Sequence, residues 1–145
     1  MPTPKSFQKF NYYAQALATK QLDLSADTFK VMLTNSAPNP ATHTQKSDLT
    51  DISAGFGYSA GGPAMTISAA ALASNVWTTK LADYLLTASG GAIGPFRYAV
   101  LYDDTSTNKI LCGFWDYGSS QTLNDGENLS LDFDDTNGVL TVTAS

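Results

Sequence analysis

The stretch that decides the fold is Phe96–Asp103, which reads FRYAVLYD and carries apolar side chains on both faces of an extended chain. Strands of this kind are typical of the buried centre of a sheet. A polar turn, Asp104–Asn108, follows, and Lys109–Tyr117 then continues as KILCGFWDY. The sequence therefore predicts a buried pair of strands around which the rest of the chain is built.

Further strand patterns lie on both sides of this pair. Thr28–Thr34 reads TFKVMLT and alternates Phe, Val and Leu with other residues, which is typical of a strand. Other alternating segments begin at Ala64, at Trp77, at Asn128 and at Val139. The run AAALA at 69–73 fits either a strand or a short helical turn.

Turn residues separate these segments. Four glycines lie within Gly55–Pro63, and the group Gly90–Pro95 interrupts the strand pattern. DDTNG at 134–138 predicts a hairpin between the last two strands. About seven short strands after one helix predict a mainly β protein, a β-sandwich or flattened barrel with the helix against one side. We expect a single domain over residues 1–145.

One helix is predicted near the N-terminus, over about residues 6–20. Phe7, Phe10, Ala14 and Leu17 recur at steps of three and four residues and form one apolar stripe. This helix docks either on its own domain or on a neighbouring subunit.

Five residues are candidates for contact with another protein. The first four are the aromatic residues Phe7, Phe10, Tyr12 and Tyr13, which offer more apolar surface than one short helix needs to hide. The fifth is His43, a loop residue expected in solvent. It lies in a long polar loop, about residues 35–52, and loops of this size are usually functional or mobile.

Composition and charge exclude several classes of partner. Charged residues make up 14% of the chain, and seventeen Thr and fourteen Ser take their place, as suits strands partly covered by other subunits. The net charge is −5 and no basic stripe occurs, so nucleic acid is not expected as a partner. No apolar run approaches the roughly 20 residues that span a bilayer. The first ten residues, MPTPKSFQKF, lack the apolar core of a signal peptide, so we expect a cytosolic protein or release by a route other than secretion.

Catalytic and metal-binding patterns are scarce. The single cysteine, Cys112, excludes an internal disulfide and a Cys-based zinc site, and its apolar setting predicts a small buried side chain instead of a reactive thiol. His43 is the only histidine, and Glu127, the only glutamate, lies in a turn. The glycine groups fit neither the dinucleotide nor the P-loop spacing. We therefore expect no enzymatic activity, no cofactor and no metal.

Acidic residues gather at two predicted strand ends, at Asp103–Asp104 and at Asp132, Asp134 and Asp135. Their oxygens could bind Ca²⁺, but neither group follows the calcium-loop pattern. Aspartate also favours turns because its side chain accepts hydrogen bonds from nearby backbone amides. Turn formation is the preferred interpretation.

The order of the segments resembles a family. TFKVMLT, GFGYSAGG, FRYAVLYDDT, KILCGFWDYG and DFDDTNGVLTV follow one another here as in the small structural proteins encoded beside the major capsid protein in tailed-bacteriophage head gene clusters. Some of those are capsid cement, or decoration, proteins, and the resemblance covers about residues 7–143. It implies a virion structural protein made in the host cytoplasm, which binds the outside of the major capsid lattice and stabilises it. Such a protein tends to form a dimer or trimer that matches the symmetry of the shell.

Two other functions remain open at this point. The chain can be a phage tail or head–tail connector component. It can also be a carbohydrate-binding β-sandwich module in which Trp77, Trp115 and the tyrosines stack on sugars, although aromatic residues at alternating strand positions more often belong to a core.

Overall fold

The computed structural model describes residues 3–144 and shows a mainly β protein, with 44% strand and 7% helix. One α-helix, α1 (Tyr12–Ala18), and a short 3-10 helix (Lys46–Asp48) accompany the strands. The strands are β1 (Gln8–Lys9), β2 (Phe29–Thr34), β3 (Ile67–Ala73), β4 (Val76–Leu81), β5 (Tyr84–Thr87), β6 (Ile93–Asp103), β7 (Leu111–Leu123), β8 (Asn128–Leu131) and β9 (Leu140–Thr143).

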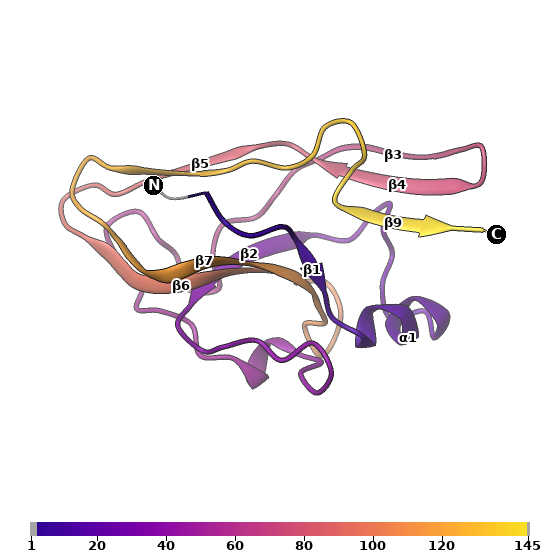
Figure 1. Ribbon diagram of the computed structural model, residues 1–145, viewed down its shortest axis with the longest axis horizontal. Coiled ribbons are helices and arrows are strands. Elements are labelled where there is room, and N and C mark those ends of the chain that lie inside the picture. Colours follow the sequence, from indigo (N-terminus) through magenta and orange to yellow (C-terminus); the bar gives the residue numbers. More distant parts are fainter. Residues whose placement is uncertain (1–2, 145) are drawn as a thin grey trace.

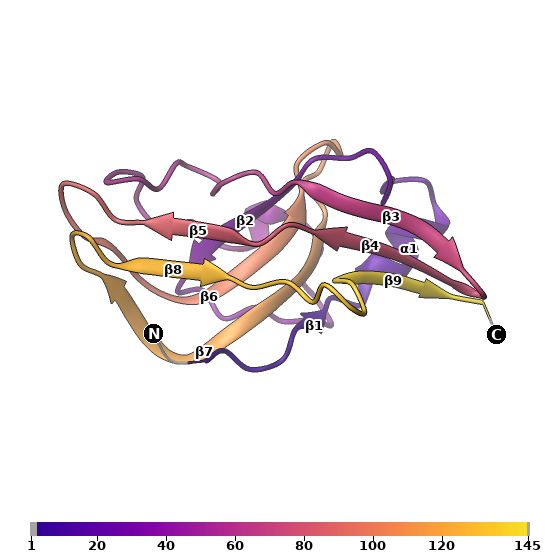
Figure 2. The ribbon, with the colours of Figure 1, turned by 90° about the horizontal axis from the view of Figure 1, so that it is seen from above.

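The strands form two layers (Figures 1 and 2). One layer is an antiparallel four-stranded sheet in the order β1-β7-β6-β2. The other contains the sheet β3-β4-β9 and, in line with it, the pair β5-β8. No sheet closes into a barrel, so of the two predicted architectures the structure has the sandwich-like one.

The central strand pair is confirmed. β6 and β7 pair antiparallel with Val100 opposite Phe114, and β2 pairs with the other edge of β6. Cys112 lies on β7 and is fully buried, as predicted, and this burial raises the pKa of its thiol. The prediction of a small buried side chain is therefore correct.

The four-stranded sheet is covered on both faces, which explains why its central strands are apolar on both sides. Val31 and Leu33 of β2 point into the core between the two layers, while Met32 points to the opposite face. On that face a second apolar cluster is covered by the segment between β2 and β3, which crosses beneath the sheet in Figure 1 and supplies Leu49. This second cluster comprises Phe10, Met32, Leu49, Tyr98, Val100, Tyr102, Leu111 and Phe114.

The segment predicted as a long polar loop, residues 35–52, is irregular but fastened to the sheet. The Thr34 hydroxyl donates to the carbonyl of Thr50 over 2.5 Å, and the Leu111 amide donates to the carbonyl of Thr44 over 3.0 Å. Leu49 is only 6% exposed. The segment is therefore a fixed cover of the sheet and not a free arm.

The predicted helix over residues 6–20 is wrong in its first half. Gln8 and Lys9 instead form β1, which pairs with Phe114 and Gly113 at the edge of β7. The open edge of β7 offers backbone partners that a helix would leave unused, and Gly113 leaves the space that the Phe7 ring fills. Only α1 remains helical.

The predicted hairpin at 134–138 is also wrong, although the chain does turn there. β8 pairs with β5 and β9 pairs with β4, so the two strands lie one after the other along two consecutive strands instead of facing each other. β5 was not predicted at all. The run at 69–73 is part of β3. β6 already begins at Ile93, within the group Gly90–Pro95, which was expected to interrupt the strand pattern.

Candidate functional site

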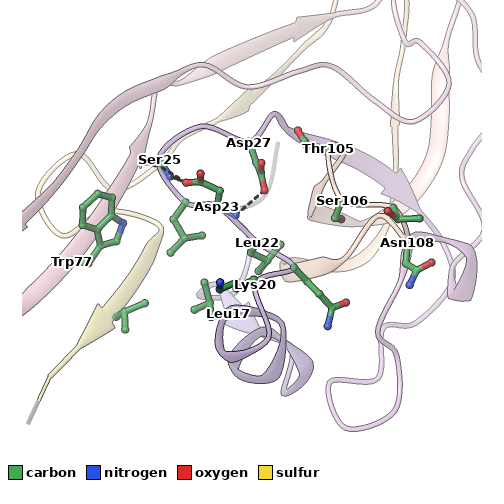
Figure 3. Close-up of a pocket in the computed structure, with 14 residues that line it drawn as sticks. Leu17, Lys20, Leu22, Asp23, Ser25, Asp27, Trp77, Thr105, Ser106 and Asn108 are labelled. Atoms are coloured by element: carbon green, nitrogen blue, oxygen red, sulfur yellow. Dashed lines mark hydrogen bonds between the residues drawn. The ribbon is translucent and has the colours of Figure 1, made fainter.

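The surface contains an open groove of about 940 Å³ (Figure 3). One wall is the end of α1 with the loop that follows it, which is flanked by β4 and β9 on one side and by the turn at 105–108 on the other. Leu17, Leu22, Trp77 and Val142 supply apolar surface to it.

The first wall is fixed by the way in which α1 ends. The Gln21 amide donates to the carbonyl of Ala16 over 2.8 Å, and the Lys20 amide donates to the carbonyl of Leu17 over 3.4 Å. Lys20 takes a left-handed φ of 61° between them. These two bonds form a Schellman motif, in which the chain turns sharply and satisfies the last helical carbonyls.

The next turn of this wall is held by two aspartates. Asp23 accepts a hydrogen bond from the Ser25 amide, and Asp27 accepts one from the Asp23 amide over 2.8 Å (Figure 3). The hydrogen bonds from Ser25 hold the pKa of Asp23 below its usual value. Both carboxylates therefore stabilise the loop itself, which leaves them less free to bind a ligand.

Trp77 and Thr79 connect β4 to the loop after α1. The Trp77 indole Nε1 donates to Thr79 Oγ1 over 3.1 Å, and that hydroxyl donates to the carbonyl of Leu24 over 2.9 Å. Trp77 is half-buried, so part of its ring faces the groove. The groove thus offers one aromatic surface among small polar groups.

Below this loop, Asp103 is fully buried at the end of β6. Its Oδ1 accepts hydrogen bonds from the amides of Thr105 and Ser106, whereas its Oδ2 has no such partner within residues 3–144 apart from the nearby carboxyl group of Asp27. Burial and Asp27 together raise the pKa of Asp103 to about 7. In its protonated form Asp103 can donate a hydrogen bond to Asp27, which would fasten the loop after α1 to the turn after β6.

This pair predicts that the protein loses stability as the pH rises. The pKa of Asp103 is about 7 in the folded protein and 3.8 in the unfolded chain. Protonated Asp103 therefore stabilises the fold fully below pH 3.8, and this stabilisation is lost as the pH rises through about 7. The slope between these two values is at most about 1.4 kcal/mol per pH unit, so the melting temperature should fall by up to about 9 °C between pH 5 and pH 8. Thermal melts at a series of pH values measure this.

Asp103→Asn is the matching variant, because the amide keeps the acceptor oxygen and donates permanently to Asp27. It should melt at nearly the same temperature at both pH values. Asp132→Asn, the same substitution at an exposed position, should retain the wild-type fall. A wild-type melting temperature that does not decrease above pH 5 would contradict the raised pKa of Asp103.

The five predicted contact residues are not brought together. Phe10 is 2% exposed and belongs to the cluster beneath the sheet, and Tyr13 is 6% exposed in the core between the layers. Phe7 and Tyr12 are half-buried and pack against that same core. The aromatic surface near the N-terminus is thus used largely by the chain itself, which is one of the two possibilities that the sequence left open.

His43 lies elsewhere, in a turn of the covering segment. Its Nδ1 accepts a hydrogen bond from the Asn39 amide over 3.1 Å, and its own amide donates to the carbonyl of Asn39 over 3.0 Å. The side chain is half-buried and not fully in solvent. With these contacts His43 stabilises a local turn of the covering segment.

The acidic strand ends show turn geometry. Asp134 Oδ1 accepts hydrogen bonds from the amides of Thr136 and Asn137, both over 2.8 Å, and these lower the pKa of Asp134. Asp104 forms ion pairs with Lys30 and Lys109. Within the described part of the chain, no group of three or more His, Cys, Asp or Glu side chains is placed to hold a metal ion.

Comparisons with known proteins give no relative: no family model, no curated protein and no solved structure matches the chain. Among residues 3–144, no helix has the length and apolar character needed to cross a membrane.

Proposed function

We propose that this chain is a structural protein of a tailed-bacteriophage virion, a capsid decoration protein that binds the outside of the major capsid lattice and stabilises it. The observation that carries the proposal is a stretch without charge, Ile52–Thr79, which ends in the projecting β3–β4 hairpin. Much of this stretch is exposed, including Phe56 and Leu72. A neutral surface can be buried against other subunits without leaving ions unpaired.

Two further features support this role. The four-stranded sheet is covered on both faces, so the body is a rigid block, as a subunit that bridges neighbouring capsomers requires. The order of five sequence segments also resembles small proteins of phage head gene clusters. Asp125 and Asp132, exposed in the acidic C-terminal half, would face solvent and keep particles apart by repulsion.

The proposal predicts that the protein acts only on the assembled shell. The seams between capsomers do not exist on free capsid protein, so many weak contacts add up only on the particle. Virions of the phage that encodes the chain should contain it in many copies by mass spectrometry. Particles stripped of it should release DNA at a lower temperature than untreated ones.

Control particles should be treated identically and then given the purified protein back, which should restore the original release temperature. Stripped particles that hold their DNA as well as untreated ones would contradict a decoration role. A particle reconstruction that places the chain on the tail would assign it to a tail or connector component instead.

A carbohydrate-binding function is a second candidate because of one observation, the half-buried Trp77 that lines the open groove. An aromatic ring beside polar groups can stack on a sugar. Trp115 is also half-buried, but its ring packs against both Phe7 and Phe133. Binding on a glycan array that is lost in Trp77→Ala would favour this function over the virion role.

A further inference from the structure

The β3 strand is a long open edge. It has seven residues, and among residues 3–144 its backbone is hydrogen-bonded only on the side of β4. The outer edge of β2, in contrast, is covered, because the Val31 amide donates to the carbonyl of Pro63 and the Met65 amide donates to that of Phe29. An open edge presents unpaired amide and carbonyl groups to any strand that approaches.

The register shows which groups are free. The Thr79 carbonyl on β4 accepts a bond from the Val139 amide, so Thr79 faces β9, and its partner Ala70 on β3 faces the opposite way. Along an antiparallel strand the backbone amide and carbonyl groups of successive residues point to opposite edges, so those of Leu72 point the same way as those of Ala70. The backbone groups of Ala70 and Leu72 therefore point away from β4, toward solvent.

The strand lacks most devices that block pairing at an edge. It reads ISAAALA, without charge or proline, and Leu72 is 66% exposed. An irregularity between Ile67 and Ala69 bends only its first residues and leaves 69–73 regular. Proteins usually protect such an edge with lysine, proline or a bulge along its length.

We propose that β3 pairs antiparallel with β3 of a second copy of this chain across a two-fold axis, joining two three-stranded sheets into one of six strands. Such an interface is self-complementary, since the same strand serves both sides. The pairing does not require the virion role, although both proposals use the uncharged stretch Ile52–Thr79.

Charge favours a second copy at this edge. Each copy has a net charge of −5, so two copies repel over most of their surfaces. The hairpin is the exception, because no charged residue occurs from Ile52 to Thr79. The first charged residue after this stretch, Lys80, belongs to β4 and therefore lies one strand away from the proposed joint. Two copies can therefore meet here without like charges in contact.

Sedimentation of the purified full-length protein tests the pairing. The wild type should be in a monomer–dimer equilibrium. Ala70→Pro removes an outward amide without touching the bonds to β4, and the loss of two bonds per dimer should weaken association about 30-fold. Leu72→Lys places two cations at the joint and should act in the same direction.

Leu85→Lys is the matched control, since Leu85 is 59% exposed on β5 and lies outside the proposed joint. It should leave the dimer unchanged, and circular dichroism should show that all three variants are folded. A wild type that stays monomeric at millimolar concentration would overturn the proposal. A dimer that survives both β3 substitutions would do so too.

Hydrogen exchange of the wild type gives a readout that needs no variant. The amides of Ala70 and Leu72 should exchange more slowly as protein concentration rises, whereas exposed amides elsewhere should not. Fast exchange of both amides in a dimeric sample would place the joint elsewhere and overturn the proposal.

Discussion

Replacing Gly62 by alanine is expected to lower the melting temperature by about 10 °C, a loss of roughly 3 kcal/mol or more. A Cβ at this position would stand 1.8 Å from the carbonyl oxygen of Val31, where the glycine-rich turn presses against β2. Gly62 also has a φ of 82°, which a residue with a side chain seldom adopts. Thermal unfolding followed by circular dichroism measures the loss.

Gly126→Ala is the control, because Gly126 has a φ of 86° and no atom within 4 Å of its added Cβ. It carries the conformational cost alone, about 1 kcal/mol. The difference between the two variants isolates the contact with Val31. Equal melting temperatures would show that the turn does not lie against β2 as described.

Phe10→Ala should be at least as damaging, with a loss of about 3–5 kcal/mol. The Phe10 ring is 2% exposed in the cluster beneath the four-stranded sheet, and its ring centroid is 5.4 Å from that of Phe114. Its removal leaves a cavity that the sheet and its covering segment cannot easily close. Chemical denaturation of the purified protein measures the change in the free energy of unfolding.

Phe56→Ala provides the comparison, since Phe56 is 52% exposed and should cost no more than about 1 kcal/mol. The pair also tests the role of Phe10 as a contact residue. If Phe10 mainly bound a partner, its replacement would weaken that binding and leave the free energy of unfolding of the isolated protein nearly unchanged.

The strands were predictable where the pattern of one segment is sufficient. FRYAVLYD is apolar on both faces because each face of β6 is covered, and TFKVMLT alternates because its residues divide between two cores. Here the local signal and the tertiary environment agree, and the prediction is correct.

The errors lie where a partner distant in sequence decides the local structure. Phe7 and Phe10 have the spacing of a helix, but the edge of β7 takes up the intervening residues as β1. DDTNG forms a turn, as Asp134 shows, but the strands that flank it have their partners in β5 and β4. Leu49 and Ile52 are the only large apolar residues in the polar segment 35–52, too weak a signal to reveal that the segment covers the sheet.

The groove could not have been predicted for a similar reason. Its walls come from the end of α1, from β4 and β9, and from the turn at 105–108, which are brought together only by the fold. Trp77 was singled out as an aromatic residue, but its neighbours Leu24 and Val142 gave no sign of the position. The pairing of Asp27 with Asp103 likewise joins residues far apart in the chain.

The pairing of strands has a consequence for the order in which the chain can fold. β1 is synthesised long before its partner residues, Gly113 and Phe114, and β4 is synthesised long before β9. Pairings this distant in sequence make folding slow and leave little that is stable until both partners have been made. The nascent chain therefore exposes its uncharged stretch, Ile52–Thr79, until β9 has been made, and we expect chaperones to bind it during that time.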